Sequence, residues 1–368
     1  MEIPVFTVDA FTNLPFKGNP AAVCLLENEL PVEFYQKIAA EMNLSETAFI
    51  TKLKSTDDFC SGARFGLRWF TPKNEVELCG HATLASSAVL FYKKGNTSPV
   101  LVFETLSGEL LVRQRGESLV MDFPLNKPEI QDPKNFKDLL KERLISSSLT
   151  SNTVTDTFVS PIYLTCTSLD CGRKPELTGR TCKLHTERTR TTPPGNRSQD
   201  LLAVRRQCYP PSCPLNNSKK IYAAVGDLPI QDVCYSKSIK KLLVRLSDSC
   251  DRSALTSLNP VTESLLSIEK SGNIKSIVIT VKGATTTAPG YDFFSRNFAP
   301  WHGIPEDPVT GSAHTVLVPY WSEKLGKKKM LAYQCSRRGG ELQLELRDDN
   351  RVDIAGQAVV ILEGTLKL

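Results

Sequence analysis

Short apolar or alternating runs recur along the chain, and turn-forming residues bound each of them. Such runs are typical of β-strands, because the side chains of a strand alternate between two faces. The pattern predicts strands at residues 5–8, 21–26, 65–70, 101–104, 110–113 and 119–123. We therefore expect a sheet to dominate the first part of the chain.

One segment between these runs has helical spacing instead. Phe34, Ile38 and Met42 recur at the interval of a helix face within residues 31–43, and acidic residues stand near the start of this segment. The spacing predicts an amphipathic helix there.

Two other runs are small and apolar on every side. Residues 82–92 and 312–321 lack a polar face, which is typical of a helix surrounded by protein. We expect a sheet to curl around each of these two buried helices.

The two flanks of the chain resemble each other in three segments that occur in the same order. Residues 68–72, 79–83 and 107–112 match residues 296–300, 310–314 and 339–344 at offsets of 228, 231 and 232. Chance can supply one such match, but three at a nearly constant offset indicate a duplicated domain. Together with the helices, the repeat predicts an α+β fold of two similar halves.

Residues 141–219 differ in texture from both halves. Ser and Thr make up 21 of these 79 residues, Pro and Arg recur, and no apolar period persists. Such a composition offers too little apolar surface to offset the entropy of ordering, so we expect disorder or a weakly packed loop. The predicted organisation is an N-terminal half at 1–140, an inserted segment at 141–219 and a C-terminal half at 220–368.

The formal net charge of +5 is concentrated in the same segment. Residues 141–219 hold 12 basic and 6 acidic residues, which leaves 33 basic and 34 acidic residues elsewhere. The main body is neutral and its aromatic residues are not interleaved with basic ones, so a nucleic-acid partner is not expected.

The chain has eleven cysteines, of which five lie in residues 141–219 and six are scattered without pair spacing. Scattered thiols are typical of a reducing compartment. Potential zinc ligands occur in the inserted segment, although their spacing does not match the tight two-residue knuckle. They are Cys166 with Cys171, Cys182 with His185, and Cys208 with Cys213. A segment without chemistry of its own is the alternative.

Length and composition place the chain among ordinary soluble proteins. Its 368 residues are 40% apolar and 23% charged, enough to form the cores of two or three domains. The first residues carry Glu2 and Pro4 where a signal peptide needs a basic start and a long apolar run. No stretch approaches the roughly 20 apolar residues of a membrane span. We therefore expect a cytoplasmic protein without a membrane partner.

The starts of the two buried helices are candidates for anion binding. Gly80 precedes His81 at one start, and Gly311 precedes Ser312 at the other. The first amides of a helix lack internal partners and carry the positive end of the helix dipole, so two such ends at one cleft would hold a carboxylate. The alternative is that both glycines only allow tight turns.

His81 and Glu46 are the titratable residues best placed to act there. His81 can donate a hydrogen bond to a substrate or move a proton near neutral pH, and a merely structural histidine is the alternative. Glu46 stands between the amphipathic helix and an apolar run, where burial would raise its pKa toward values useful in acid/base catalysis. The alternative is that Ser45 and Glu46 only cap a turn. His302 and His314 are expected to be structural.

Two residues beside the helix starts admit more than one role. Asp307 precedes the second helix, and its carboxylate can cap that helix or contact a substrate. Cys79 precedes the first helix, where racemases and epimerases with two catalytic thiols place one of them. Thr310 occupies the equivalent position in the second half, so the thiol pair is broken and Cys79 is expected to be a buried small residue.

Four segments together resemble the motifs of the phenazine-biosynthesis F-type isomerase family. They are GNPAAV at 18–23, LSETAF at 44–49, CGHAT at 79–83 and EDPVTGSA at 306–313. The resemblance covers about residues 1–140 and 222–368. It implies a diaminopimelate-epimerase-like fold of two pseudo-symmetric halves, each a β-barrel-like sheet around a central helix, with the active site between them.

The resemblance also implies a reaction and the residues that perform it. The expected reaction is a cofactor-free and metal-free isomerisation of a small anionic substrate by a homodimer. Glu46 matches the catalytic acid/base of the family, His81, Asp307 and Ser312 match residues that contact substrate and handle protons, and Asn19, Gly80 and Gly311 belong to the motifs that line the cleft.

Two hypotheses of different class therefore stand. The first is a proton-transfer isomerase acting on a small carboxylate-bearing substrate. The alternative is a catalytically idle scaffold or regulatory homologue that binds a protein partner through the basic residues 141–219. That segment lies near the link between the halves, where it could displace the first strand of the second half and prevent assembly of the site.

Overall fold

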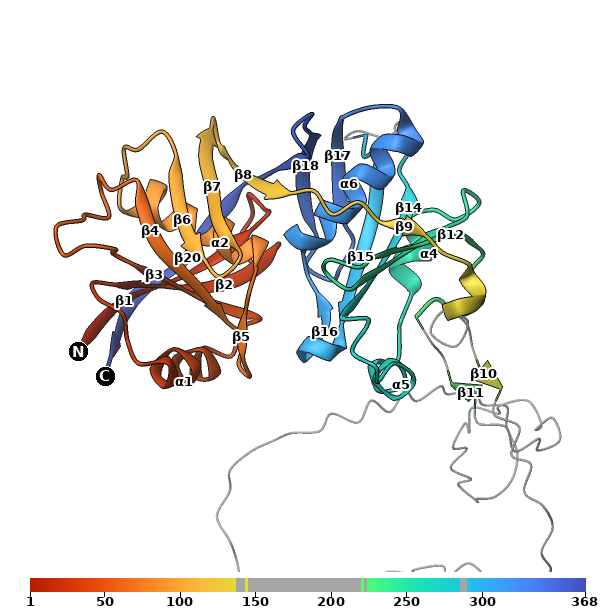
Figure 1. Ribbon diagram of the computed structural model, residues 1–368, viewed down its shortest axis with the longest axis horizontal. Coiled ribbons are helices and arrows are strands. Elements are labelled where there is room, and N and C mark those ends of the chain that lie inside the picture. Colours follow the sequence, from red (N-terminus) through yellow and green to blue (C-terminus); the bar gives the residue numbers. More distant parts are fainter. Residues whose placement is uncertain (137–142, 145–219, 222–223, 285–289) are drawn as a thin grey trace, which may run out of the picture. The chain divides into compact units, whose positions relative to one another are not determined.

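The computed structural model describes residues 1–136, 143–144, 220–221, 224–284 and 290–368 (Figure 1). The candidate zinc ligands and nearly all of the predicted inserted segment lie outside these residues. Residues 1–145 and 219–368 form one compact unit. At its border, the short strands β10 (Arg143–Leu144) and β11 (Lys220–Ile221) pair antiparallel, which brings the two sides of the segment together.

Seven strands of the first half lie side by side in one sheet, and the six predicted strands are confirmed among them. In spatial order they are β1 (Glu2–Ala10), β2 (Asn19–Leu26), β3 (Glu46–Thr51), β4 (Arg64–Phe70), β6 (Leu101–Thr105), β7 (Gly108–Arg115) and β8 (Ser118–Pro124). The pairs β2–β3 and β4–β6 are parallel, and the other neighbours are antiparallel. The short strand β5 (Glu75–Val76) pairs with the end of β4.

The second half repeats this order and these directions. Its strands are β12 (Ile230–Ser236), β13 (Lys241–Leu246), β14 (Ser276–Lys282), β15 (Phe293–Ala299), β17 (Lys329–Gln334), β18 (Gly340–Leu346) and β19 (Arg351–Gly356). The parallel pairs β13–β14 and β15–β17 take the places of β2–β3 and β4–β6, and β16 (Ile304–Asp307) takes the place of β5. The duplication inferred from three sequence matches is therefore a duplication of topology, and the first strand of the second half is in place.

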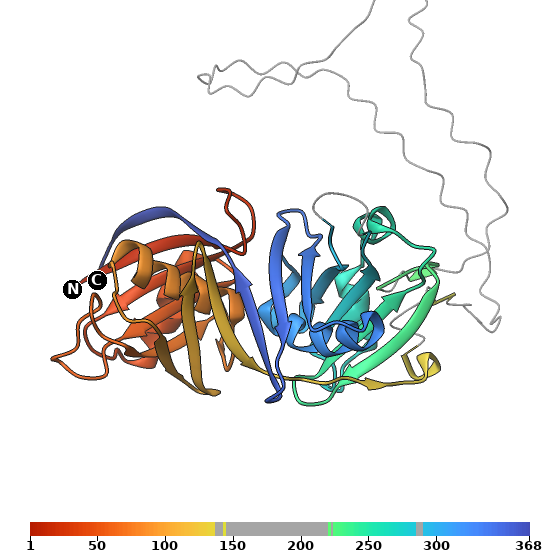
Figure 2. The ribbon, with the colours of Figure 1, turned by 90° about the horizontal axis from the view of Figure 1, so that it is seen from above.

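Three strand pairings join the halves. β8 and β19 pair antiparallel, and β9 (Glu129–Ile130) pairs with β12. The last strand, β20 (Ala358–Lys367), follows the second half in sequence but pairs with β1 of the first half. The two termini consequently lie side by side (Figure 2).

The predicted amphipathic helix is α1 (Val32–Met42), but its buried face differs from the predicted one. Tyr35 and Ile38 are buried, whereas Phe34 is 38% exposed. The ring of Tyr35 lies 5.4 Å from that of Phe70 in a stacked arrangement and 4.7 Å from that of Phe49 edge-on. The face therefore turns toward these two rings of the sheet, and Phe34 is left at the surface.

The two predicted central helices are α2 (Gly80–Ala88), continued by a π-helical turn at Val89–Lys93, and α6 (Gly311–Leu325). Every residue of α2 is buried, and α6 is buried over most of its length. Figure 1 shows each helix against the strands of its own half. Shorter helical segments are α4 (Arg252–Ser257), α5 (Thr262–Ile268), Pro133–Phe136 and Pro300–His302. None of the helices among the described residues has the length and apolarity needed to cross a membrane.

The central helices begin against each other, at Gly80 and Gly311. A Cβ added to Gly80 would lie 2.8 Å from the Cα of Gly311, and one added to Gly311 would lie 2.9 Å from the Cα of Gly80. Neither glycine has a positive φ. Both are therefore needed for close approach of two backbones rather than for a tight turn, which contradicts the tight-turn alternative.

We predict that Gly80→Ala destabilises the protein by about 1–3 kcal/mol, because the new methyl group overpacks a backbone contact that cannot yield. Denaturant unfolding measures this change. Gly66→Ala is the matched control, since Gly66 lies in β4 and its added Cβ would meet nothing closer than 3.6 Å. A Gly80→Ala protein as stable as the Gly66→Ala protein would show that the helix starts do not touch in solution.

Candidate functional site

The contact between the two helix starts is also where the candidate residues gather. The residues preceding the helices, Cys79 and Thr310, do not accept a hydrogen bond from a first-turn amide with their side chains. The first amides of both helices are thus left without side-chain caps, and their positive ends lie together. A carboxylate placed there would be attracted by both helices.

Glu46 reaches this place from the first residue of β3, where it lies beside Ala21 of β2 in parallel register. Its carboxyl group is buried, and its Oε2 lies 3.2 Å from Nε2 of His81. Oε2 has no hydrogen-bond partner among the described residues. Burial, and then the charge of Asp307, raise the pKa of Glu46 above its usual range, while a hydrogen bond from Ser45 lowers it.

His81 is the second residue of α2 and is 3% exposed. Its ring lies between two groups, with Nδ1 3.4 Å from Sγ of Cys79 and Nε2 3.2 Å from Oγ of Ser45. Burial lowers the pKa of His81 to about 3, so the ring is neutral at pH 7. The expected titration of His81 near neutral pH therefore does not apply to the unliganded protein.

Asp307 comes from the second half, at the end of β16. Its Oδ1 accepts a hydrogen bond of 2.6 Å from Nδ2 of Asn19, and its Oδ2 accepts one of 2.6 Å from Oγ1 of Thr310. Asp307 thus accepts a hydrogen bond from the hydroxyl group of the N-cap residue and not from the amides of α6. It therefore does not cap α6, which was one of the two roles expected from the sequence. Burial raises the pKa of Asp307, and the hydrogen bonds and the charge of Lys241 oppose this rise.

Asn19 connects the two halves. It is the first residue of β2 and fully buried, and its amide nitrogen also donates to the carbonyl of Val309 at 3.0 Å. Its Oδ1 lies 3.3 Å from Oγ of Ser45 and accepts a hydrogen bond from it. A chain of contacts consequently runs from Cys79 through His81, Ser45 and Asn19 to Asp307.

Ser312 follows Gly311 and is half-buried in the first turn of α6. Within the described part of the chain its hydroxyl makes no side-chain hydrogen bond, and its carbonyl accepts one from Thr315. The structure thus gathers Glu46, His81, Asp307, Ser312, Asn19, Gly80 and Gly311 around one contact between the halves.

The structure adds residues that the sequence did not single out. Gln334 of β17 holds the loop before α6, because its Nε2 donates to the carbonyl of Asp307 at 2.6 Å and its Oε1 accepts from the amide of Thr310 at 2.9 Å. Ser45, for which the sequence suggests only a turn cap beside Glu46, contacts both Asn19 and His81. Both side chains act across long sequence separations, for which spacing along the chain gives no signal.

Lys241 is a third addition, at a position that the repeat relates to Ala21 of the first half. It pairs with Ser276 in the parallel register of β13–β14, as Ala21 pairs with Glu46 in β2–β3. Its buried ammonium group donates to Oγ of Ser276 and, at 3.1 Å, to Oδ1 of Asn297. Burial lowers the pKa of Lys241 to about 8. The second half therefore has a serine bonded to a lysine where the first half has a carboxyl group.

The other histidines occupy different surroundings. His314 is buried in α6, with Nδ1 2.7 Å from the carbonyl of Thr310 and its ring stacked 6.0 Å from that of Phe293. Burial lowers its pKa to about 4. His302 lies in the short helical turn after β15, half-buried. These surroundings agree with structural roles.

Ligand atoms of Glu46, Cys79 and His81 lie within 4.8 Å of one another, close enough to consider a metal ion. The thiol faces Nδ1 of the ring and the carboxyl group faces Nε2. One ion binds only one nitrogen of an imidazole, so it would leave one of these neighbours on the wrong side. The arrangement therefore fits a hydrogen-bonded chain better than a metal centre.

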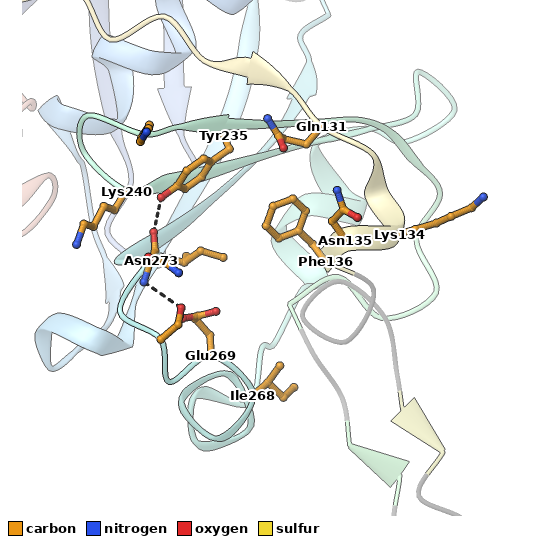
Figure 3. Close-up of a pocket in the computed structure, with 12 residues that line it drawn as sticks. Gln131, Lys134, Asn135, Phe136, Tyr235, Lys240, Ile268, Glu269 and Asn273 are labelled. Atoms are coloured by element: carbon orange, nitrogen blue, oxygen red, sulfur yellow. Dashed lines mark hydrogen bonds between the residues drawn. The ribbon is translucent and has the colours of Figure 1, made fainter.

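A large hollow lies elsewhere in the described residues. A cavity of about 700 Å³ lies between residues 131–136, the turn after β12 and residues 268–274. Figure 3 shows Phe136 facing this space and Lys134 extending away from it, and Tyr235 donates a hydrogen bond to the carbonyl of Asn273. No residue of the candidate site lines this cavity.

Comparisons with known proteins extend over the whole chain. The sequence model of the family described as phenazine biosynthesis-like protein matches residues 8–167 and 212–364. The phenazine biosynthesis-like domain-containing protein of Homo sapiens is 45% identical over 367 residues, with 100% of this chain and 99% of the relative covered. An uncharacterized isomerase of Pseudomonas aeruginosa is 34% identical over 368 residues, with both chains covered to 100%.

Solved structures show the same fold. A phenazine biosynthesis protein of Enterococcus faecalis, of the PhzF family, superposes with a TM-score of 0.67 at 29% identity, with both chains covered to 100%. A predicted epimerase from Pseudomonas aeruginosa superposes with a TM-score of 0.55 at 15% identity over 99% of each chain, which concerns the fold alone. The chain belongs to the phenazine biosynthesis-like protein family and has its diaminopimelate-epimerase-like fold of two pseudo-symmetric halves.

Proposed function

We propose that this protein is an isomerase that moves a proton on a small carboxylate-bearing substrate, with Glu46 as the general acid/base. The observation that carries the proposal is the buried carboxyl group of Glu46, which has an unpartnered oxygen beside two uncapped helix starts. Membership of a family with relatives named as isomerases supports the class of reaction.

The proposed reaction needs two proton transfers at one residue. The substrate carboxylate binds at the amides of Gly80 and Gly311, and the Glu46 carboxylate takes a proton from an acidic C–H bond. The electron pair of that bond delocalises into the conjugated substrate as the bond breaks. Glu46, now protonated, returns the proton to another carbon, so the product is an isomer and the enzyme is regenerated.

Burial makes Glu46 suitable for both transfers. A carboxylate in water is a weak base, whereas a carboxyl group of raised pKa is a stronger base and still a competent acid near neutral pH. The ring of His81 beside it is uncharged, so it adds no positive charge that would lower this pKa. Asp307 and Ser312 complete the surroundings on the side of the second half.

The asymmetry of the repeat supports a single acid/base. A two-base racemase needs an acid/base group from each half, but Ser276 stands where the second half would repeat Glu46. Thr310 likewise occupies the position at which the second half would repeat Cys79. The duplicated frame therefore carries one catalytic carboxyl group rather than a matched pair, which favours a proton shift within one face of the substrate.

We predict that the protein catalyses exchange of substrate hydrogen with deuterium from heavy water, and that Glu46→Gln slows this exchange about 10²- to 10⁴-fold, because the amide cannot accept the proton. Mass spectrometry of small carboxylic acids incubated with the protein measures the label. Glu41→Gln is the matched control, since Glu41 is an exposed carboxyl group of the same region.

If no carboxylic acid exchanges and a protein co-purifies through residues 141–219, the scaffold alternative holds instead. Exchange that persists unchanged in Glu46→Gln would move the catalytic role to another residue.

The pH dependence of exchange offers a separate prediction. Since the carboxylate is the active form, the rate rises with pH through the pKa of Glu46, which lies above its ordinary value of 4.5. Asp307→Asn removes a charge that raises this pKa, so the rise shifts to lower pH although the maximal rate falls. Asp307→Glu keeps the charge and is expected to keep the position of the rise. An unshifted profile in Asp307→Asn would mean that the two carboxyl groups do not interact.

A further inference from the structure

The neighbours of the His81 ring determine which nitrogen carries its proton. A neutral imidazole has one N–H donor and one acceptor nitrogen, and coordinates without hydrogens leave the choice to the hydrogen-bond network. Both nitrogens of His81 have a polar neighbour, with Sγ of Cys79 at Nδ1 and Oγ of Ser45 at Nε2. Each neighbour can donate or accept, so the remaining contacts of the neighbours settle the direction.

Ser45 is the first of these neighbours. Its hydroxyl has one hydrogen, and it donates toward Oδ1 of Asn19 at 3.3 Å and the carbonyl of Pro20 at 3.4 Å. Both of these oxygens can only accept, so the hydroxyl hydrogen serves one of them and the hydroxyl oxygen is left to accept from His81. In this arrangement Nε2 carries the ring proton.

Cys79 is then the partner of a nitrogen that has only a lone pair. It lies at the N-cap position of α2 and is 6% exposed. Burial, and then the charge of Glu46, raise the pKa of Cys79 well above its usual range, so the thiol keeps its hydrogen. At 3.4 Å from Nδ1 it is the donor in reach of that lone pair among the described residues.

We propose that Cys79 is a positioning residue, whose thiol donates a hydrogen bond to Nδ1 of His81 and so keeps the ring proton on Nε2, toward Glu46. The hydrogen bond is a property of the unliganded protein and does not depend on the proposed function. Only its effect on the rate rests on that function.

The consequence concerns the ionised form of Glu46. Nε2 lies 3.2 Å from Oε2 of Glu46 as well as 3.2 Å from Oγ of Ser45, so a proton on Nε2 leaves an N–H available to Glu46 when that group becomes a carboxylate. With the proton on Nδ1, a lone pair would face the carboxylate and repel it. The thiol thus helps to orient the base, although it takes no part in proton transfer to substrate.

This role explains why only the first half has a thiol before its central helix. The second half has Ser312 in the place of His81, and a hydroxyl group has no ring whose tautomer must be fixed. Thr310 in the place of Cys79 instead donates to Asp307. A thiol beside the helix start is therefore needed in one half only.

His314 provides an internal reference of the opposite kind. Its Nδ1 lies 2.7 Å from the carbonyl oxygen of Thr310, which can only accept, so Nδ1 carries the proton. The structure therefore assigns opposite tautomers to the buried histidines of the two central helices. Only four histidines are present in the chain, which makes their ring signals separable.

Nitrogen NMR of the full protein labelled with ¹⁵N-histidine tests the assignment without any substrate. The spectrum of a His81→Gln protein identifies the signals of His81. We expect a protonated Nε2 and a hydrogen-bonded, unprotonated Nδ1 for His81, and the reverse tautomer for His314. A protonated Nδ1 on His81 would overturn the proposal.

Three variants separate positioning from packing. In Cys79→Ala the Nδ1 signal of His81 is expected to move toward that of a free acceptor, whereas Cys79→Ser, which keeps a donor, retains the original pattern. Cys234→Ala, which removes a buried thiol of β12, is the control and leaves His81 unchanged. Unchanged His81 signals in Cys79→Ala would contradict the role assigned to the thiol.

The rate supplies a second readout. Cys79→Ala is expected to lower kcat for deuterium exchange about tenfold with little change in KM, the size of one lost hydrogen bond, and Cys79→Ser to restore most of it. Equal kcat values in the wild-type and Cys79→Ala proteins would overturn the effect on the base. If no substrate exchanges while the NMR pattern is as expected, the proposed function fails and the hydrogen bond of Cys79 stands.

Discussion

The contact between Gly80 and Gly311 is the constraint on which the rest of the site depends. Two helix starts can approach this closely only where neither carries a side chain, and their positive ends then lie together. The approach also brings loops from different halves within hydrogen-bonding distance, so that Asn19 can bond Asp307. Without it, each half would still have a buried helix in a sheet, but Glu46 and Asp307 would belong to separate surfaces.

The duplication preserves the frame and changes the chemistry. Arg68 pairs with Glu75 and lies over the ring of Phe70, and Arg296 pairs with Glu306 and lies over Phe298 in the same way. These matched ion pairs hold β5 and β16 against their neighbouring strands in both halves. At the helix starts the equivalence ends, because glutamate, cysteine and histidine in one half correspond to serine, threonine and serine in the other. A symmetric scaffold thus supports an asymmetric site.

The sequence predicts the elements well and their partners only in part. Alternation identified the strands, and the apolar runs identified α2 and α6, because these signals are local. Tyr35 is buried instead of Phe34 because its ring packs against rings of β3 and β4, which lie elsewhere in the sequence. The pairing of β20 with β1 joins opposite ends of the chain. Neither feature has a local signal in the sequence. The named site residues lie together as the family resemblance implied. Lys241 and Gln334 were missed because their contacts span 35 and 24 residues or more.

Two buried carboxyl groups in one site cannot both be ionised at low cost, so the surroundings must decide which one keeps a proton. Burial raises the pKa of both. Asp307 is then compensated by hydrogen bonds from Thr310 and Asn19 and by the charge of Lys241, whereas Glu46 has only the hydrogen bond from Ser45. The negative charge therefore settles on Asp307 and the proton on Glu46. The largest of these compensations is the hydrogen bond from Thr310, and the charge of Lys241, whose register partner is Ser276 instead of a second glutamate, comes next. The asymmetry of the repeat therefore extends from the identity of the residues to the location of the proton.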